Sequence, residues 1–301
     1  MKRAHTKNAV GPWAHQKLDG LEAYLTAYTM ALSKQSFTLV YIDAFAGAGK
    51  SWVRGSCNDV RDADSLFLDE ALERGEAQFI EGSPRRALGL AKPFSKYFFF
   101  DADPVRVQVL EGLKSEYPGK EISVEVGDGN VLIHRILPHI DRRTTRGIAF
   151  LDPYGPHLHW DTLKALGATQ HFEVIINFPL GMAINRLITR SGNIPDNWRS
   201  DLNACFGGDD WEKLVYNDTA TLFGSTERQK VDDAGGRLLD YYVRRLKGLF
   251  GHVATPSVVR NTRGAPIYYI LWAGPHPLGH KIADHVLKLG ERIVLQKKSS
   301  R

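Results

Sequence analysis

The 301-residue sequence predicts an α/β fold with a mostly parallel, seven-stranded sheet that ends in an antiparallel hairpin and carries helical insertions. Short apolar runs recur about one helix length apart, a glycine-rich loop directly follows the first run, and turn residues join two late runs. Runs that are continuously apolar, and not alternating, are typical of parallel strands that helices cover on both faces. We expect the central strands at 38–43, 97–100, 122–126, 148–151 and 174–178.

The first predicted element is an amphipathic helix. Its apolar residues recur at alternating steps of four and three, which places them on one face: Ala14, Leu18, Leu21, Leu25, Tyr28 and Leu32. The strand at 38–43 comes next and leads into the glycine loop at 44–49. We expect an insertion over about 50–82 before the next strand–helix unit.

Two of the later helices have a recognisable start. Ser83 precedes Pro84 and Asp103 precedes Pro104, and a capping side chain followed by proline is typical of the first turn of a helix. Each serine or aspartate is therefore predicted to be an N-cap.

The last third of the chain departs from the repeating pattern. Residues 183–250 are predicted to form a mainly helical insertion, with loops at Gly207-Gly208 and Gly235-Gly236. Two strands at 253–259 and 267–272 then form the hairpin. We expect the whole of 1–301 to form a single domain.

Composition narrows the function classes. The chain carries 39 Lys+Arg against 34 Asp+Glu, a net charge of +5, with 43% apolar and 24% charged residues. These are ordinary globular values. The two cysteines, Cys57 and Cys205, have no metal-ligand spacing, which argues against a disulfide scaffold or a zinc finger. Without a membrane-length apolar run or a secretory signal, we expect a cytoplasmic enzyme or binding protein.

The candidate site lies where the strands end, because ligands of open α/β sheets bind beyond the carboxyl ends of the strands. The first strand ends at Asp43, and the loop after it contains Phe45, Gly47 and Gly49. Glycines at this spacing let the backbone turn tightly and approach a ligand closely. A carboxylate at the entry of such a loop can hold a cationic ligand group.

The next two strands also end in acidic residues. Asp101 follows the strand at 97–100 and is placed to accept hydrogen bonds from ribose hydroxyls, while Asp103 caps the following helix. Asp128 and Asn130 follow the strand at 122–126 and could bind an exocyclic amine or form only a polar turn.

The fourth strand ends in Asp152-Pro153-Tyr154-Gly155. Asp152 can accept a hydrogen bond from a substrate N–H, Pro153 has no N–H of its own, and Tyr154 offers a flat face for a base. We expect these three residues to form the catalytic part of the site. The fifth strand ends at Asn177, which is predicted to be either a pocket wall or core.

A phosphate-binding loop is the main competing interpretation of the first loop. Residues 44–51 fit the looser Walker pattern that ends in Gly49-Lys50-Ser51. A phosphate loop needs a helix that begins at the lysine, and the segment after Ser51 is a poor helix former because it contains Gly55 and Asn58. We therefore rank a P-loop NTPase third among the functions.

Histidines and basic residues give weaker signals. His157 and His159 follow the fourth strand, but no third metal ligand accompanies them, so no metal is expected. Four basic clusters could contact phosphates or be solvated faces: Arg85-Arg86, Arg142-Arg143-Arg146, Arg186/Arg190 and Arg244-Arg245-Lys247.

Taken in order, the motifs at 41–49, 81–84, 101–103, 127–130 and 150–155 resemble those of the three-Cys-motif partner (TcmP) proteins. These are proteins with the Rossmann-like class I methyltransferase fold, and the likeness runs from about Trp13 to the strand at 268–272. The Asp152 motif is also similar to the Asp-Pro-Phe-Gly of tRNA guanine N2-methyltransferases. It is more loosely similar to the Asp-Pro-Pro-Tyr of amino-methyltransferases, but has a single proline before Tyr154.

The resemblance implies S-adenosyl-L-methionine as cofactor and N-methylation of a base in a nucleic acid or nucleotide. It implies that Asp152 orients or deprotonates the acceptor amine, and that these residues bind the cofactor: Asp43, Phe45, Gly47, Gly49, Ser83, Asp101, Asp103, Asp128 and Asn130. A three-Cys-motif protein is the implied partner. The alternative is a non-catalytic, cofactor-binding accessory subunit of such a partner.

Overall fold

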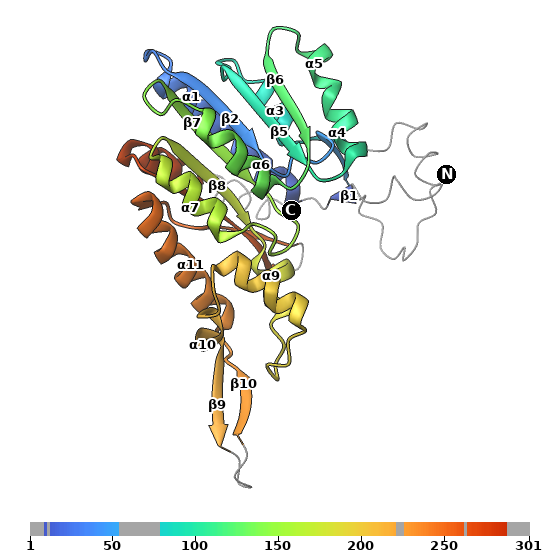
Figure 1. The fold of residues 1–301 in the computed structure, drawn as a ribbon, viewed down its shortest axis with the longest axis vertical. Helices are drawn as coiled ribbons and strands as arrows, with labels where there is room; N and C mark the ends of the chain where they lie inside the picture. The colour runs from blue at the N-terminus through green and yellow to red at the C-terminus, as the bar shows by residue number, and fades with distance from the viewer. Residues whose placement is uncertain (1–8, 11–12, 54–78, 221–225, 262–263, 288–301) are drawn as a thin grey trace, which may run out of the picture.

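The computed structural model of the chain describes residues 9–10, 13–53, 79–220, 226–261 and 264–287. A central sheet crosses the molecule (Figure 1). Its strands lie in the order β6 (Glu121–Val126), β5 (Lys96–Asp101), β2 (Thr38–Asp43), β7 (Thr145–Leu151), β8 (Phe172–Phe178) and β13 (Pro266–Gly274), with β11 (His252–Val253) and β12 (Ser257–Arg260) both paired with β13.

The strand directions confirm the predicted Rossmann-like fold class. The five strands from β6 to β8 pair in parallel, whereas β13 is antiparallel both to β8 and to its partners β11 and β12. The sheet has eight strands where seven were predicted, because the predicted strand at 253–259 is split into β11 and β12. Pro256, which lies in the interruption, has no N–H to donate to a neighbouring strand.

Helices cover both faces of the sheet. Alternate side chains of β2 belong to different cores: Val40 and Ile42 to one, Leu39 and Tyr41 to the other. The first core is closed by α6 (Gly129–Ile136), α7 (Trp160–Thr169) and α11 (Ala234–Phe250), and the second by α1 (Trp13–Leu32), α3 (Ser83–Leu88), α4 (Pro104–Glu111) and α5 (Leu113–Glu116). A short 3₁₀ helix, η2 (Leu137–His139), follows α6.

The chain order across the sheet creates a crevice at the carboxyl ends of β2 and β7. From β2 the chain proceeds to β5 and β6 on one side, and then returns to β7 and β8 on the other. Helices leave the sheet in opposite directions at such a switch point, which is where α/β proteins bind ligands. This edge of the sheet carries the candidate site.

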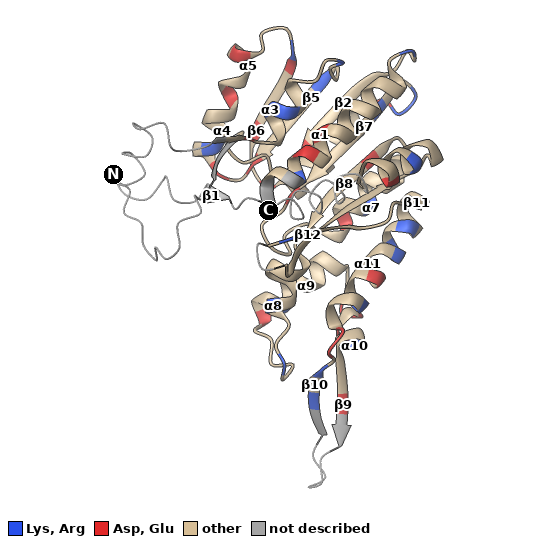
Figure 2. Ribbon diagram, turned by 180° about the vertical axis from the view of Figure 1, so that it is seen from behind, with Lys and Arg blue, Asp and Glu red and all other residues tan. Residues whose placement is uncertain are grey.

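The segment between β8 and α11 is partly a hairpin, although it is predicted to be mainly helical. It contains η3 (Leu180–Ile184), α8 (Asn185–Leu187), α9 (Asp196–Phe206) and α10 (Trp211–Val215), followed by the antiparallel strands β9 (Tyr216–Ala220) and β10 (Thr226–Lys230). Figures 1 and 2 show these two strands extending away from the rest of the molecule. The predicted loop at Gly207-Gly208 is confirmed, since Gly207 ends α9 with a left-handed backbone conformation. The prediction of a loop at Gly235-Gly236 is wrong, because both glycines lie within α11.

Two further predictions concern the region around residue 80. Most of the insertion at 50–82, including Cys57, lies outside the described residues. Its two ends form β3 (Lys50–Val53) and β4 (Phe79–Glu81), which pair with each other in a small sheet with β1 (Ala9–Val10). Ser83 is not an N-cap: Gly82 takes that position, and Ser83 is the first residue of α3. Asp103 caps α4 as predicted, accepting from the N–H of Val105.

None of the described helices is long and apolar enough to cross a membrane.

Candidate functional site

A cavity of about 380 Å³ opens at the carboxyl edge of the sheet. Five of the predicted site residues line it: Phe45, Asp101, Asp128, Asn130 and Tyr154. His157, His159 and Arg106 line it as well. The other predicted residues lie outside the lining: Asp43, Gly47, Gly49, Ser83, Asp103, Asp152 and Pro153. The structure thus gathers part of the predicted set around one cavity that lies at the switch point.

The glycine loop is tied to the carboxylate of Asp101. The N–H of Gly47 donates to Asp101 Oδ2 over 2.9 Å, and the N–H of Asp103 donates to Oδ1 at the same distance. Gly47 and Gly49 have φ angles of +64° and +68°, a region that L-residues with side chains rarely adopt. The loop conformation therefore depends on both glycines and on Asp101.

Arg106 was not predicted from the sequence. It lies on the first turn of α4, where its guanidinium is 3.5 Å from Asp101 and 3.7 Å from Asp103. Its Cζ is also 5.9 Å from the centre of the Tyr154 ring. The arginine therefore reaches from one wall of the cavity toward the other. Its only sequence signal is its place three residues after the N-cap, which is too general to single it out.

The loop after β6 is held against the first loop and against β7. A Cβ on Gly129 would lie 2.2 Å from the carbonyl oxygen of Ala44, so only glycine fits there. Asn130 is buried, and its amide nitrogen donates to Asp128 Oδ1 and to the carbonyl of His157, each over 2.9 Å. Its amide oxygen accepts from the N–H of His159 and the hydroxyl of Thr162.

The side chain of Asn130 is thus fully used within the protein, because an amide has two donor hydrogens and two acceptor lone pairs. It fastens the loop that carries Tyr154, His157 and His159 to the loop that carries Asp128. Its backbone N–H is used as well, because it donates to Asp128 Oδ1 over 2.9 Å. We therefore infer that Asn130 positions the two loops, in place of its predicted role as a cofactor ligand.

Asp43 is completely buried at the end of β2. Burial raises the pKa of its carboxyl to about 7; the Ser83 hydroxyl and the Phe45 N–H donate to it and lower the pKa, while the nearby charge of Asp152 raises it. Ser83 therefore serves Asp43 instead of the helix start. Asp43 Oδ1 has no partner among the described residues. A buried, unpaired carboxylate oxygen is costly unless a ligand satisfies it.

Asp152 is contacted by two residues from distant elements. The ammonium of Lys17, on α1, donates to Oδ2, and the amide of Asn177, at the end of β8, donates to Oδ1 over 2.6 Å. Asn177 Oδ1 is itself buried without a partner among the described residues. Asn177 is therefore not only a core residue, because it also holds the Asp152 carboxylate. Lys17 was not predicted, because a single lysine beside the apolar face of a helix is an ordinary feature.

The phosphate-loop interpretation does not fit the local structure. Lys50 and Ser51 begin strand β3 and pair with β4, so no helix starts at the lysine. A phosphate loop depends on the N–H groups of such a helix.

Three of the four predicted basic clusters are used at least partly within the protein. Arg85 is buried and paired with Glu116. Arg146 lies over the ring of Phe37, and Arg245 lies over that of Trp160. The fourth cluster, Arg186 and Arg190, differs from these three. Both of its side chains are exposed, and neither forms an ion pair with the described residues.

Comparison with known proteins gives similar folds at low identity. No family model and no curated protein matches the sequence. Protein LPL1258 from Legionella pneumophila is 14% identical over 90% of this chain and 91% of its own (TM-score 0.45). The putative methyltransferase yhhF from Escherichia coli is 12% identical over 84% of this chain and 86% of its own (TM-score 0.33). Trm5b from Pyrococcus abyssi is 13% identical over 83% of this chain and 48% of its own (TM-score 0.35).

These likenesses carry no functional argument at such scores. Membership of the three-Cys-motif partner family stays a prediction.

Proposed function

We propose that this protein is an S-adenosyl-L-methionine-dependent methyltransferase that methylates an amino nitrogen of a nucleobase. The observation that carries the proposal is the cavity at the switch point, with carboxylates from two successive strand ends on its wall. Asp101 and Asp128 both line it, and a volume of about 380 Å³ is within the range of small-molecule sites.

The residues present fit this cofactor. Asp101 retains lone pairs to accept from ribose hydroxyls, since a carboxylate offers about four acceptor positions. Asp128 uses Oδ1 for Asn130 and leaves Oδ2 for an adenine amine. The unpaired Asp43 Oδ1 can accept from a cationic group beside the glycine loop. Gly47, Gly49, Phe45 and Ser83 would shape that end of the site, and Asp103 would act through α4 and Arg106.

The acceptor side is supplied by Asp152 and Asn177. The Lys17 ammonium bound to Asp152 Oδ2 shows that an N–H donor fits beside this carboxylate. An acceptor amine could donate to a further lone pair of Asp152 and to the unpaired Asn177 Oδ1. Two such acceptors would localise the nitrogen lone pair, which in a free base is delocalised into the ring.

S-Adenosylmethionine, when bound, supplies an electrophilic methyl group on a sulfonium. The chain contributes by holding the acceptor nitrogen at near-attack distance. It also provides a negative carboxylate, at Asp152, where positive charge develops on that nitrogen and where its proton leaves. Lys17, which is paired with Asp152 Oδ2, offsets part of this charge.

Calorimetric titration with S-adenosylhomocysteine tests the proposal. We expect micromolar binding by the full chain, weakened about 10- to 100-fold in Asp101→Asn, because a hydrogen bond to a charged group is removed. Asp141→Asn, an exposed aspartate at the opposite edge of the sheet, is the matched control and should bind like the wild type. Failure of the wild-type protein to bind this ligand would refute the proposal.

A cofactor-binding accessory subunit is the second candidate. The observation that favours it is that both oxygens of Asp152 are already engaged by Lys17 and Asn177. Labelled cofactor incubated with DNA, RNA and protein pools separates the two. Transfer that is lost in Asp152→Asn indicates the enzyme. Binding without transfer, whether or not a three-Cys-motif protein is added, indicates the accessory subunit.

A further inference from the structure

We propose that Arg106 and Tyr154 form a clamp that holds the acceptor base between a guanidinium plane and an aromatic ring. The acceptor is then a nucleobase with both faces free, as in an unpaired or extruded nucleotide. This inference rests on the proposed methyltransferase function and names the substrate class of the same site.

The Tyr154 ring is available for stacking. It is 69% exposed, the highest value among the large apolar and aromatic side chains at the surface of the described residues, and it is the only aromatic ring among them. It nevertheless lines the cavity. Its loop is fixed behind it by the four hydrogen bonds of Asn130, so the ring stands on a rigid support.

Arg106 lies over that ring at the outer limit of a cation–π contact. Its Cζ lies 5.9 Å from the ring centre, whereas Arg146 lies 4.0 Å from Phe37 and Arg245 lies 4.1 Å from Trp160. Those two pairs are in stacking contact. The Arg106–Tyr154 pair is therefore open by almost 2 Å in comparison.

The opening is close to what a base requires. Stacked bases are spaced by about 3.4 Å, so a base between two planes needs about 7 Å. The distance of 5.9 Å from Arg106 Cζ to the centre of the Tyr154 ring is about 1 Å short of this separation. The exposed side chain of Tyr154 can provide this by a small rotation, because no neighbour packs over most of its surface.

The charges around Arg106 favour a base over a phosphate. Asp101 and Asp103 already flank its guanidinium edge, and these two carboxylates repel a phosphate. What remains is the planar face, on which bases stack in nucleic-acid complexes as they do on aromatic rings. An aliphatic amine offers no such face, and a base within a duplex has both faces covered by its neighbours.

Fluorescence quenching of 2-aminopurine tests the clamp, because this base loses emission when it stacks. The probe is a single-stranded trinucleotide with central 2-aminopurine, added to the full chain saturated with S-adenosylhomocysteine. We expect saturable quenching by the wild type. Affinity should fall about 10- to 100-fold in Tyr154→Leu and in Arg106→Gln, as for the loss of one stacking partner. The same base within a duplex should bind at least tenfold more weakly.

Two further variants separate a plane from a charge. Arg106→Lys keeps the charge beside Asp101 and Asp103 but loses the plane, so it should bind the probe as weakly as Arg106→Gln. Arg146→Gln removes an arginine–aromatic stack at the other edge of the sheet and should leave probe affinity unchanged. Cofactor affinity is measured in every variant and should stay within twofold for Tyr154→Leu.

The outcomes distinguish the clamp from the underlying function. Wild-type affinity in Tyr154→Leu or Arg106→Lys, or equal affinity for the duplex, would overturn the clamp while leaving the methyltransferase proposal intact. Absence of S-adenosylhomocysteine binding by the wild type would instead remove the proposed function itself.

Discussion

Glu173 is a buried carboxyl far from the candidate site, at the amino end of β8. The hydroxyl of Tyr24 donates to its Oε2 over 2.5 Å and the indole N–H of Trp272 donates over 3.3 Å. Burial raises its pKa to about 7, although both donors lower it. The carboxyl of Glu173 links α1 and β13 to β8 through these two hydrogen bonds. In the folded protein it keeps its proton up to about pH 7, whereas in the unfolded chain it releases the proton near pH 4.5.

This pKa predicts a pH-dependent stability. Because the folded pKa is raised, the stabilising contribution is complete below pH 4.5 and is lost as the pH rises to about 7. The side chain of Glu173→Gln cannot titrate. Between pH 4.5 and about 7, the unfolding free energy of this variant should therefore rise relative to that of the wild type, by up to about 3 kcal/mol. Denaturant unfolding from pH 4 to 8 measures the difference.

Tyr24→Phe is the companion variant. It removes a donor that stabilises the charged carboxylate, so the window should extend to higher pH. A constant difference between Glu173→Gln and the wild type over the whole range would contradict the burial of an ionisable group. Asp43, whose pKa is also about 7, keeps its own contribution in all three proteins.

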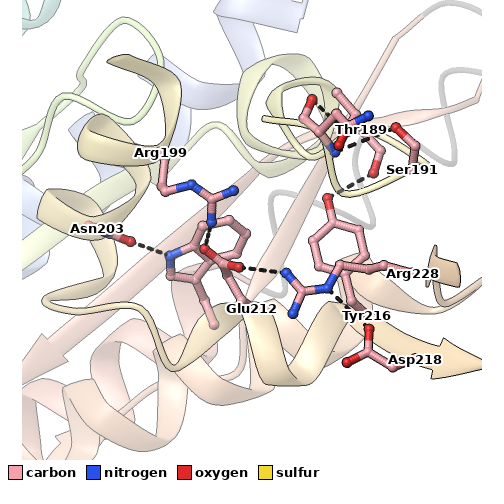
Figure 3. Close-up of polar contacts among 10 residues, drawn as sticks. Thr189, Ser191, Arg199, Asn203, Glu212, Tyr216, Asp218 and Arg228 are labelled. Carbon is pink, nitrogen blue, oxygen red and sulfur yellow. Dashed lines mark hydrogen bonds and ion pairs between the residues drawn. The ribbon is translucent and has the colours of Figure 1, made fainter. Parts of the chain in front are cut away.

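At the scale of elements, the hairpin β9–β10 is anchored by polar contacts at its base (Figure 3). Glu212 on α10 pairs with Arg199 of α9 and, over 3.1 Å, with Arg228 of β10. Tyr216 donates to the carbonyl of Thr189 over 2.8 Å, and Trp211 donates to Asn203. An isolated two-stranded hairpin is marginally stable in water, so these contacts explain how β9–β10 stays formed.

Glu212→Gln tests this anchor. Glu212 is largely buried and serves two arginines, so its loss should cost about 1–3 kcal/mol, between the values for exposed and buried pairs. Amide hydrogen exchange in β9 and β10 should accelerate, while S-adenosylhomocysteine binding is unchanged. Asp210→Asn breaks the exposed pair with Lys213 and should leave both exchange and the unfolding midpoint unchanged. Slow hairpin exchange in Glu212→Gln would show that other contacts hold it.

The same elements show what sequence patterns can predict. The central strands β2, β5, β6, β7 and β8 follow from continuous apolar runs, and the start of α4 follows from Asp103 before Pro104. The short strands β3 and β4 were not predicted, because they lie in the segment expected to be an insertion. The hairpin β9–β10 does not follow from such runs: Asn217, Asp218 and Gln229 give it no apolar alternation, and its stability comes from Glu212 and Arg199 in other elements. Likewise, Gly235 and Gly236 lie in a helix because the apolar face of α11 packs on the sheet.

At the scale of the molecule, Asn130 joins the two halves of the sheet. Its partners lie after β6 on one side of the switch point and after β7 on the other. Asn130→Asp replaces two donated hydrogen bonds with repulsion from Asp128 and the carbonyl of His157. We expect transfer to slow at least tenfold with cofactor affinity changed less than threefold, as measured by single-turnover assays and calorimetry.

Thr162→Val, which removes one of the four bonds, is the milder control and should retain most of the rate. Equal losses of rate and of cofactor affinity in Asn130→Asp would mean that Asn130 serves the cofactor side alone.

Strand ends predict part of the cavity lining, and they do not predict contacts between distant elements. Asp101, Asp128 and Tyr154 lie at or shortly after strand ends and line the cavity, whereas Asp43 and Asp152 lie at strand ends outside the lining. Lys17 reaches Asp152 from the first helix, Arg106 faces Tyr154 across the cavity, and Asn130 turns inward to four partners. Each of these contacts depends on which distant segments the fold brings together, and patterns in a single sequence do not predict those pairings.

If the chain is the methyltransferase proposed above, the place of Arg106 and Tyr154 at the cavity fixes the order in which its ligands bind and leave. A base held between them would cover whatever lies deeper, against Asp101 and Asp128. The methyl donor must then enter before the acceptor, and the methylated product must depart before the spent donor can follow. Steady-state inhibition by the spent donor would accordingly be competitive with the fresh donor and not with the nucleic acid.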